Sequence, residues 1–536
     1  MLTSIVVLSG NVGAGKTTLA RLLVDRFRAV HVKTHDLLSR LGRDVPQERR
    51  ALQNFGELLD KKTKGTWVRT GLQHVIRELV DESLVVVDSV RIPEQIEAVR
   101  SSYGRKVAHI HLTADLSVLE KRYRQRAVTS LKELPSYAAV RRNKTERRVE
   151  QLGEIADAVI RTDRSTSEDV LVRVASYIGL YGRENRQLVD VIVGGGYGSE
   201  GKGQIAAYLA PEYDLLVRVG GPNAGHCVYE VPRPYVFHHL PSGSRASNAK
   251  LIIGPGAVLY VPELQREISE CRIPYDRLSI DPQAMIISES DRTKEARLQE
   301  TIGSTGRGVG YATARRITDR GVKALRLARD IKELRPFVRD THQLLEDAFR
   351  DGQRVLLEGT QGTGLSLFHG YYPHVTSRDT TVSGCLAEAG IAPSRVRKVV
   401  MVCRTYPIRV EDPEKKGTTS GPMSVEITWN TIARRSGHNA SKLRSNERTS
   451  TTQRRRRVGE FDWTLLRKAA TLNAPSDIAL TFVDYIIKHN ERARRLEQLS
   501  DETIRFIEEI ERVASAPVSL IATRFHSRSI IDRRSW

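Results

Sequence analysis

Two glycine-rich loops that end on a lysine are the segments of this chain best suited to chemistry. Val191–Gln204 reads Val-Ile-Val-Gly-Gly-Gly-Tyr-Gly-Ser-Glu-Gly-Lys-Gly-Gln, and Gly10–Thr17 reads Gly-Asn-Val-Gly-Ala-Gly-Lys-Thr. Each loop follows a short apolar run and precedes a helix-prone segment. Glycines let backbone N–H groups curl around an anion at a helix N-terminus, and a lysine adds a point charge. The chain therefore predicts two phosphate-binding loops.

The loop near the N-terminus fits the Walker A pattern G-x-x-x-x-G-K-S/T at every fixed position. Its N–H groups are expected to cradle phosphates, with Lys16 reaching the outer ones and the Thr17 hydroxyl binding Mg²⁺. The residues predicted to form this site are Gly10, Gly13, Gly15, Lys16, Thr17 and Thr18.

Polar residues after the next predicted strands suggest which class of P-loop protein the first domain belongs to. Leu84–Val87 is a buried-type strand that ends in Asp88, which could orient a Mg²⁺ water or an acceptor, while Arg91 could hold a phosphate. The alternative is a strand-end cap with a surface arginine. Asp36 is a further candidate, at the start of a helix that follows a second strand. Three arginines lie on another predicted helix: Arg122, Arg124 and Arg126. They resemble the lid arginines that neutralise the transferred phosphoryl group in small kinases, or they form a solvent-exposed helix face. Residues 1–180 resemble P-loop kinases of the adenylate-kinase type.

The loop Val191–Gln204 resembles the signature loop of adenylosuccinate synthetases, roughly W-G-D-E-G-K-G-K. Later segments resemble that family's motifs in the same order, and an ordered series is far more specific than one glycine motif. They are Val217–His226, His238–Gly243, Ile253–Gly256, Ile302–Gly308, Val355–Thr363, Tyr372–Thr381, Thr451–Gly459 and Leu480–Asp484.

This resemblance implies a role for each matched residue. His226 is the acid on the 6-oxygen of a purine, Gln361 orients the purine, and Lys202 and Ser199 complete the catalytic set. The implied monophosphate-binding residues are Asn223, Thr305, Gln361 and Thr376, and the implied aspartate-binding residues are Thr452, Arg454 and Arg456. Those for the triphosphate are Gly198, Glu200, Gly201, Lys202, Gly203 and Asp484, and those for Mg²⁺ are Ser199 and the carbonyl of Gly225.

The family also lends an arginine from a neighbouring subunit, which implies a homodimer and should lie within Arg315–Arg320. The implied partners are otherwise small molecules: a purine monophosphate, L-aspartate and a nucleoside triphosphate.

Three departures from the family pattern bear on chemistry. Ser199 stands where an aspartate removes the purine N1 proton, and a serine is a poor base near neutral pH. Gln453 replaces a glycine of the aspartate loop. Phe482 replaces a lysine, and Ala522–Phe525 replaces the segment S-T-G-P that reads guanine in the family. Because both guanine-reading segments are altered, the phosphate donor could be either GTP or ATP. The polar run Glu411–Asn446 is also unlike the family and is expected to be a mobile loop.

Several functions remain open at this stage. The domain could ligate L-aspartate to IMP, or to GMP or dGMP, because a small hydroxyl at position 199 leaves room for a 2-amino group. Viral 2-aminoadenylosuccinate synthetases are understood to lack the same aspartate, so Ser199 resembles that branch. The alternative is a catalytically inactive synthetase-like domain that binds nucleotides and regulates an active kinase.

The elements needed to hold these sites predict an α/β protein of two domains, each a mostly parallel central sheet flanked by helices. The expected boundaries are 1–180 for the kinase-like domain, 181–187 for a linker and 188–536 for the synthetase-like domain. The chain has 536 residues, and Lys+Arg 85 against Asp+Glu 64 gives a formal net charge of +21. This charge suits nucleotides and acidic ligands, and the sequence lacks a recognisable nucleic-acid-binding motif. Four widely spaced cysteines and no apolar run of about 20 residues predict a soluble, cytoplasmic protein without a membrane span.

Overall fold

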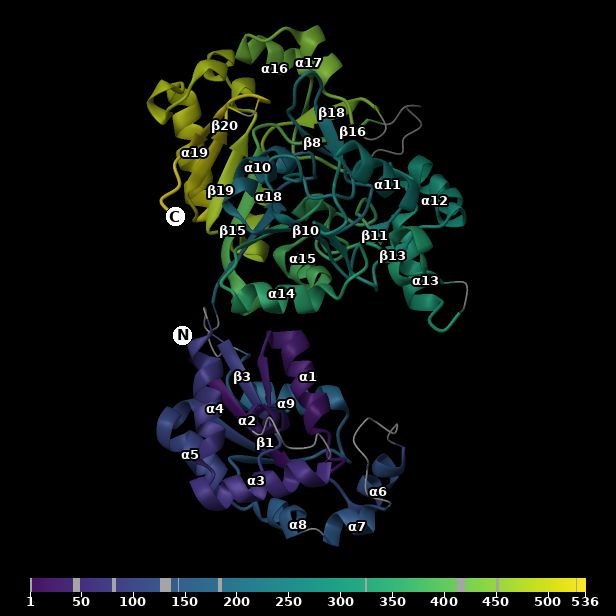
Figure 1. Ribbon diagram of the computed structural model, residues 1–536. Helices are drawn as coiled ribbons and strands as arrows, with labels where there is room; N and C mark the ends of the chain where they lie inside the picture. The colour runs from purple at the N-terminus through teal and green to yellow at the C-terminus, as the bar shows by residue number, and fades with distance from the viewer. Residues whose placement is uncertain are drawn as a thin grey trace. The chain divides into compact units, whose positions relative to one another are not determined.

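The chain divides into two compact units, Met1–Arg183 and Glu184–Trp536, coloured purple to blue and teal to yellow in Figure 1. Each unit is an α/β domain around a mostly parallel sheet, so the predicted fold class is confirmed. The computed structural model describes residues 2–41, 49–79, 83–125, 136–142, 144–181, 186–322, 325–411, 420–449, 453–526 and 528–536.

The first unit is built on five described strands: β1 (Leu2–Gly10), β2 (Val30–Lys33), β3 (Ser83–Asp88), β4 (Val107–Thr113) and β5 (Ala158–Arg161). They are all parallel, in the order β2-β3-β1-β4-β5. In β1, Val6 and Leu8 enter one core whereas Ile5 and Val7 enter the other, as expected for a sheet that is covered on both faces.

Helices supply both cores of the first unit. Side chains of α1, α6 and α9 join one core, and side chains of α4 and α5 join the other. The helices are α1 (Lys16–Phe27), α2 (Thr34–Leu41), α3 (Arg49–Thr63), α4 (Thr66–Arg77), α5 (Pro93–Tyr103), α6 (Leu116–Arg124), α7 (Tyr137–Arg142), α8 (Lys144–Gln151) and α9 (Ser167–Tyr177).

The second unit has a sheet of nine described strands: β6 (Val189–Gly194), β7 (Leu215–Arg218), β10 (Lys250–Ile253), β12 (Leu278–Ile280), β14 (Val355–Glu358), β15 (Val396–Arg404), β19 (Asp477–Thr481), β20 (Val518–Ala522) and β21 (Ile530–Asp532). Their order is β12-β10-β7-β14-β6-β15-β19-β20-β21, and β21 alone among them pairs antiparallel. After β6 the chain forms the strands on one side of it, from β7 to β14, and then the strands on its other side, from β15 to β21. The strand order therefore reverses at β6, and in such sheets ligands bind beyond the strand ends at this point.

Both faces of this sheet are covered by helices. Side chains of α14, α15, α18 and α19 pack on one face, and those of α10 and α11 pack on the other. The helices are α10 (Lys202–Leu209), α11 (Val261–Glu270), α12 (Glu289–Ile302), α13 (Val309–Thr318), α14 (Thr341–Arg350), α15 (Val382–Ala389), α16 (Trp429–Ser436), α17 (Ala440–Asn446), α18 (Trp463–Asn473) and α19 (Asp501–Ala514).

Short strands outside the main sheet hold loops near its carboxyl edge. They are β8 (His226–Val228) with β9 (Tyr235–Phe237), β11 (Val258–Leu259) with β13 (Met285–Ile286), and β18 (Arg456–Gly459) between β16 (Ile408–Val410) and β17 (Glu426–Ile427).

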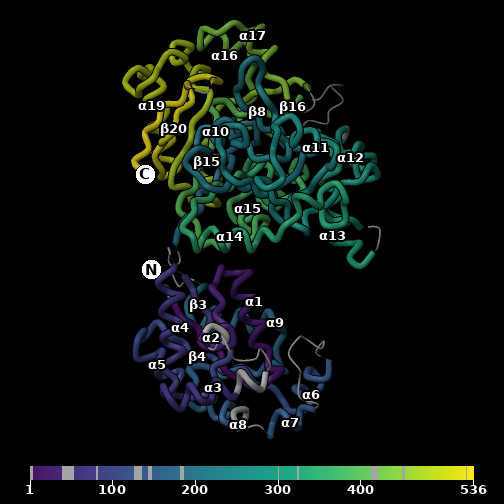
Figure 2. The backbone as a smooth tube through the Cα atoms, in the orientation of Figure 1, coloured from purple at the N-terminus to yellow at the C-terminus, as the bar shows by residue number. Residues whose placement is uncertain are grey.

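The expectation of a mobile loop over Glu411–Asn446 was wrong for the part that the structure describes. Residues 426–446 form β17, α16 and α17, whose backbone is traced in Figure 2. Trp429, Ile432 and Leu443 are buried in a small core of their own. These helices form because their apolar residues recur at helical spacing. Residues 412–419 lie outside the described residues.

Candidate active site

The glycine loop of the second unit leaves β6 at Gly194 and enters α10 at Lys202. Gly198, Ser199 and Gly201 within it have φ angles of 87°, 57° and 89°. Glycine adopts this left-handed conformation freely, whereas a serine keeps it only where its surroundings impose it. Ser199 is therefore held in place by its contacts.

A buried carboxylate shapes this loop. Oε1 of Glu200 accepts hydrogen bonds from the backbone N–H groups of Gly196 at 3.1 Å and Gly198 at 2.6 Å, and Oε2 accepts one from Nζ of Lys202 at 2.5 Å. The side chains of Glu200 and Lys202 are each 2% exposed, so the two charges offset one another. Both carboxylate oxygens of Glu200, a predicted triphosphate-binding residue, are therefore engaged within the loop and shape it.

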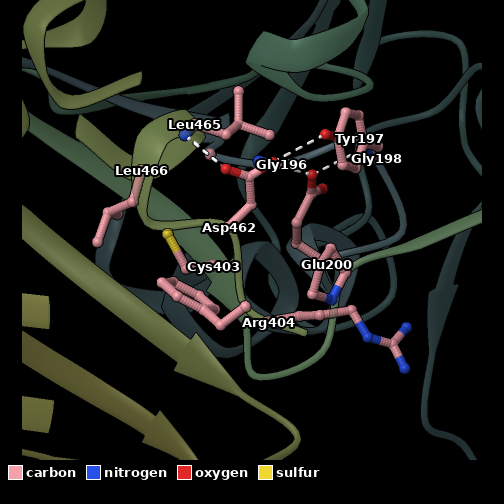
Figure 3. Close-up of a pocket in the computed structure, with 12 residues that line it drawn as sticks. Gly196, Tyr197, Gly198, Glu200, Cys403, Arg404, Asp462, Leu465 and Leu466 are labelled. Carbon is pink, nitrogen blue, oxygen red and sulfur yellow. Dashed lines mark hydrogen bonds between the residues drawn. The ribbon is translucent and has the colours of Figure 1, made fainter. Parts of the chain in front are cut away.

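Residues of the loop line one side of a pocket (Figure 3). Cys403, Phe461 and Leu465 line its apolar side. Tyr197 of the loop donates its hydroxyl to Oδ2 of Asp462 at 3.1 Å, which ties the loop to the start of α18. The pocket thus lies against a mostly apolar side of the loop, whose Gly196 and Gly198 N–H groups already donate to Glu200.

His226 begins β8, beside the ends of two sheet strands. Its Nδ1 is hydrogen-bonded to Oε1 of Glu358, the last residue of β14, and Nη1 of Arg218 donates to the same oxygen at 3.1 Å. Ser242 donates both its hydroxyl and its N–H to Glu358. A Cβ on Gly203 would come within 2.7 Å of the Cβ of His226, so glycine lets α10 approach the imidazole. The carboxylate orients the ring and leaves Nε2 for a substrate.

The charges around His226 favour a neutral ring. Burial and the neighbouring Arg218 lower the pKa of His226 to about 4. Burial opposes ionisation of Glu358, yet Arg218 and His226 lower the pKa of Glu358 to about 2. At neutral pH Glu358 is therefore charged, and the ring proton sits on Nδ1.

Sequence analysis did not identify Glu358 or Arg218 as site residues. A signal was present, because each is a charged residue that ends an otherwise apolar strand. A buried strand that ends on a charge places that charge at the carboxyl edge of a parallel sheet, where ligands bind.

Three of the four predicted monophosphate-binding residues form one cluster. Oγ1 of Thr376 accepts hydrogen bonds from Nε2 of Gln361 at 2.8 Å and from Nδ2 of Asn223 at 3.3 Å. The side-chain oxygens of Gln361 and Asn223 are buried without a partner in the described structure. Buried polar atoms without partners are costly, so these two point to a ligand. No hydrogen bond among the described residues joins Thr305 to this cluster; the Thr305 carbonyl accepts from Gln299 at 2.9 Å.

Ser199 is contacted by two arginines. Nη2 of Arg456, a predicted aspartate-binding residue, donates to the Ser199 hydroxyl at 3.2 Å. Nη1 of Arg404, which sequence analysis missed, donates to the Ser199 carbonyl at 3.3 Å. The serine oxygen thus accepts a bond from a cation and is not activated as a base.

Arg454, a second residue predicted to bind aspartate, lies just before β18. Nη2 of Arg454 donates to the carbonyl of Glu411 at 2.9 Å, and its buried Nε has no partner among the described residues. Gln453 has a φ of 54°, so it adopts the left-handed conformation expected where the family has glycine. Thr452 lies outside the described residues.

Asp484, which is predicted to bind the base of the donor nucleotide, has a buried carboxyl group. Oδ1 of Asp484 is buried without a partner in the described structure, and Nε2 of His438 contacts the Asp484 carbonyl at 3.0 Å. Burial raises the pKa of Asp484 to about 7. Phe482 has a φ of 59°, and its ring lies 3.9 Å below the guanidinium carbon of Arg404. A carboxyl group that titrates near neutrality can either accept or donate a hydrogen bond to a base.

In the first unit the Walker loop joins β1 to α1. Gly10, Gly13 and Gly15 have φ angles of 136°, 89° and 95°, and Nζ of Lys16 donates to the Gly10 carbonyl at 2.7 Å. Thr18 follows at the start of α1 with its side chain exposed. Nζ of Lys16 is therefore held against the backbone of the loop that is expected to bind phosphate.

Asp88 ends β3 next to this loop. Its Oδ2 accepts from the Thr17 hydroxyl at 3.1 Å and contacts Nε2 of His31 at 3.3 Å, and its Oδ1 accepts from the Ser89 hydroxyl at 2.7 Å. Burial opposes ionisation, yet these bonds and Lys16 lower the pKa of Asp88. An ionised carboxylate beside the Walker threonine suits a Mg²⁺ site.

The remaining candidates of the first unit are less closely grouped. Asp36 is exposed on α2 and pairs with His35 at 3.2 Å, while the N–H of Arg91 donates to Gln95 at 2.9 Å. Arg122 is turned inward, because Nη1 donates to the Thr162 hydroxyl at 2.8 Å and to the Gly13 carbonyl at 3.4 Å. In this structure Arg122 therefore supports the Walker loop. Arg126 lies outside the described residues.

These features define a nucleotide-binding α/β enzyme with a separate P-loop unit. The model of the adenylosuccinate synthetase family matches residues 191–332 and 326–491, and the model of an AAA domain matches residues 5–152. The chain belongs to the adenylosuccinate synthetase family, ligases of purine nucleotide biosynthesis, and adds a P-loop kinase-like domain at its N-terminus.

Individual relatives agree with this assignment. The chain is 38% identical over 355 residues to the adenylosuccinate synthetase of Thermococcus onnurineus, covering 64% of this chain and 98% of the relative. It is 37% identical over 353 residues to that of Methanocaldococcus jannaschii, covering 64% and 96%. A cyanophage S-2L succinoaminodeoxyadenylate synthetase (PurZ), solved with dGMP and with dATP as an energy donor, superposes with a TM-score of 0.54 and 27% identity over 65% of this chain and 96% of that one. The described helices include none that is long and apolar enough to cross a membrane.

Proposed function

We propose that the second unit joins L-aspartate to C6 of a 6-oxopurine nucleoside monophosphate, and that it prefers dGMP or GMP to IMP. The observation that carries this proposal is Ser199. The phosphate loop around it is intact, but the residue itself is small, neutral and paired with Arg456. A carboxylate at this position would serve as the N1 base for IMP, whereas a serine leaves space for a 2-amino group.

The chemistry would follow two steps. The purine loses its N1 proton to water as the donor's γ-phosphoryl group is transferred to the 6-oxygen and nucleoside diphosphate leaves. The amino nitrogen of L-aspartate then bonds to C6 as inorganic phosphate leaves, and the amine proton is released to water. Lys202, together with those loop N–H groups that do not donate to Glu200, would stabilise the transferred phosphoryl group. The negative charge of the bound phosphates would favour protonation of His226, so that Nε2 could donate a proton to the 6-oxygen. Arg454 and Arg456 would bind the carboxylates of L-aspartate.

Support for the 2-aminopurine substrate comes from a relative of known structure. The cyanophage synthetase that this unit resembles was solved with dGMP and dATP. Its 27% identity and full-length match make it a useful guide to substrate class. The archaeal relatives are more similar in sequence, so an IMP-using enzyme is the competing assignment.

The donor is proposed to be ATP or GTP, selected in part by the protonation of Asp484. An ionised carboxylate can accept hydrogen bonds from guanine N1–H and its amino group, whereas a protonated one can pair with adenine N1 and its amino group. Because the pKa of Asp484 is raised to about 7, the ionised fraction increases as pH rises through neutrality.

We therefore expect the ratio of kcat/KM for ATP over GTP to fall about tenfold or more between pH 6 and pH 8. Asp484→Asn presents one donor and one acceptor at every pH, so it should favour ATP and remove the pH dependence. Steady-state kinetics with each donor across this range check the expectation. A ratio that does not change with pH in the parent protein would contradict it.

Magnesium ions would fit the two units differently. In the first unit the Thr17 hydroxyl and the ionised Asp88 form a hard-oxygen pair that suits Mg²⁺, which there would neutralise charge on the donor phosphates. In the second unit only the Ser199 hydroxyl and the Gly225 carbonyl are proposed ligands, and the Glu200 oxygens are already occupied. Mg²⁺ would depend on the ligand phosphates there.

The unit is proposed to act as a homodimer in which an arginine crosses to the partner's monophosphate site. Within the segment Arg315–Arg320, Arg315 is bound to Asp291 at 2.6 Å and Arg316 to backbone carbonyls. Arg320 is exposed and has no hydrogen bond or ion pair within the described residues, which makes it the best candidate.

The first unit is proposed to be a nucleotide kinase. It would either phosphorylate the aminated monophosphate that a lyase forms from the ligase product, or make the monophosphate that the ligase uses. Lys16→Ala should lower phosphorylation of purine monophosphates by about 10²-fold or more, because the lysine stabilises the transferred phosphoryl group. Ligase turnover should not change, since its residues lie on the other unit. Lys121→Ala, an exposed lysine on α6, is the matched control. If the parent protein phosphorylates none of AMP, IMP, GMP, dGMP, 2-amino-dAMP and the corresponding nucleosides, the kinase assignment is wrong.

The proposed ligase function is tested by turnover of the full-length protein. IMP, GMP, dIMP and dGMP are each supplied with L-aspartate, Mg²⁺ and either ATP or GTP, and released phosphate and succinyl-purine product are measured. We expect most product from dGMP or GMP. No product from any combination would favour the alternative, an inactive synthetase-like domain that binds nucleotides and regulates the kinase.

A further inference from the structure

One buried carboxylate lies between the two ends of the proposed ligase site. Glu447 follows α17, and its side chain is 3% exposed. Its Oε1 accepts hydrogen bonds from Nη2 of Arg404 at 2.7 Å and from the hydroxyl of Tyr485 at 2.8 Å. Its Oε2 accepts one from Nη1 of Arg456 at 3.0 Å. A single side chain thus fixes three residues from separate parts of the sequence.

Two of these partners, Arg456 and Arg404, also contact the loop at which phosphoryl transfer is proposed. Arg456 donates its other nitrogen, Nη2, to the Ser199 hydroxyl at 3.2 Å, and Nη1 of Arg404 donates to the Ser199 carbonyl at 3.3 Å. Arg456 is also proposed to bind L-aspartate. The position of Glu447 therefore sets both the amino-acid arginine and residue 199 of the phosphate loop.

The other contacts reach the proposed donor-base end. Tyr485 follows Asp484 in the short 3₁₀ turn η7 (Val483–Tyr485). The guanidinium of Arg404 stacks on Phe482, immediately before this turn, at 3.9 Å. A shift of the turn when a base binds would reach Glu447 through the Tyr485 hydroxyl and through Arg404.

The charges explain why a carboxylate is needed at this point. Burial and the nearby Arg404 lower the pKa of Arg456, although Glu447 opposes this. Burial opposes ionisation of Glu447, yet Arg404 and Arg456 lower the pKa of Glu447. The carboxylate is therefore charged and keeps two repelling guanidinium groups side by side. The three groups together carry one net positive charge beside Ser199, which an anionic ligand would balance.

We propose that Glu447 is a positioning residue that couples the donor-nucleotide end of the ligase site to its amino-acid end. The proposal rests on the ligase function proposed above. Donor binding at η7 is transmitted through Tyr485, Arg404 and Glu447 to Arg456, and it raises the affinity for L-aspartate. By linkage, L-aspartate raises the affinity for the donor by the same factor.

The test is a calorimetric titration of L-aspartate into the full-length protein. The cell contains MgATP, MgGTP or no nucleotide, and it contains no purine monophosphate, so that no ligation takes place. For the parent protein we expect one donor to lower the Kd of L-aspartate at least about fivefold. For Glu447→Gln we expect less than about a twofold change, because the neutral amide no longer holds both arginines. A purely structural role would lower the folded fraction without removing the dependence on donor.

Three further variants make the test decisive. Glu460→Gln removes a carboxylate that pairs with Arg435 at 2.7 Å on the surface, and it should retain the full donor effect. Glu447→Asp should restore part of it. If Glu447→Gln does not fold, Tyr485→Phe keeps both ion pairs and should weaken the donor effect. The proposal is overturned if the parent protein shows no donor effect on L-aspartate, or if both Glu447→Gln and Tyr485→Phe retain it. Because the titration omits purine monophosphates, its failure is separate from a failure of the proposed substrate.

Discussion

Replacing His226 by asparagine is expected to lower kcat of the ligase reaction by about 10² to 10⁴-fold, the usual range for a positioned proton-transfer group. The residue begins β8 with its ring oriented by Glu358 and Arg218, so that only Nε2 remains for the substrate. Asparagine keeps a polar group near Glu358 but cannot exchange the proton. Phosphorylation by the first unit should be unchanged. Single-turnover measurements of succinyl-purine formation separate this loss from weaker binding.

Two comparisons sharpen this expectation. His489→Asn changes an exposed histidine of the same unit and should leave turnover within about twofold. Glu358→Gln keeps the imidazole but removes the charge that fixes its tautomer, and a comparable loss is expected. Glu358→Gln also leaves Arg218 buried without its counter-charge, so the thermal stability of this variant must be measured alongside. Full activity of His226→Asn would rule out a role in proton transfer.

Ser199→Asp is expected to exchange the substrate preference of the ligase. A carboxylate at this position can remove the N1 proton of IMP, and kcat/KM for IMP should rise by about 10²-fold. The longer side chain occupies the space left for a 2-amino group, so kcat/KM for dGMP should fall about tenfold or more. The change is tolerated by the fold because Arg456 and Arg404 already face residue 199, and aspartate accepts a positive φ better than most residues.

Ser199→Asn separates charge from size in this experiment. Asparagine matches aspartate in volume and in its tolerance of a left-handed φ, but it has no carboxylate. It should therefore impair dGMP as much as aspartate does while leaving IMP without benefit. If Ser199→Asp improves dGMP, or if asparagine and aspartate behave alike with IMP, the argument from the 2-amino group is wrong.

The two strand–turn–helix segments that carry the glycine-rich loops were predictable from sequence because each is local. A β-branched run, closely spaced glycines and a lysine specify a strand, a turn and a helix within about 20 residues. The Thr17–Asp88 pair was also predictable, since parallel strands bring their carboxyl ends to one edge. The families matched for both units then agree with the predicted order of domains.

The site residues that sequence analysis missed are brought together by contacts between segments far apart in the sequence. Arg404, Glu447 and Tyr485 meet only because β15, α17 and β19 end at the same place, and no spacing in the sequence predicts this. The error over residues 426–446 had a different cause. Trp429, Ile432 and Ala433 recur at i, i+3 and i+4 on α16, so the helical period was present but was outweighed by the polar composition of the segment.

A competition between two purines tests the central claim most directly. Equimolar IMP and dGMP are supplied together with L-aspartate, Mg²⁺ and both ATP and GTP, and the succinyl products are quantified by mass early in the reaction. Their ratio equals the ratio of the two kcat/KM values, whatever the fraction of active protein. The account built on Ser199 predicts that the 2-amino product dominates. Predominance of adenylosuccinate would contradict it and would identify an IMP-using synthetase that works without the usual carboxylate.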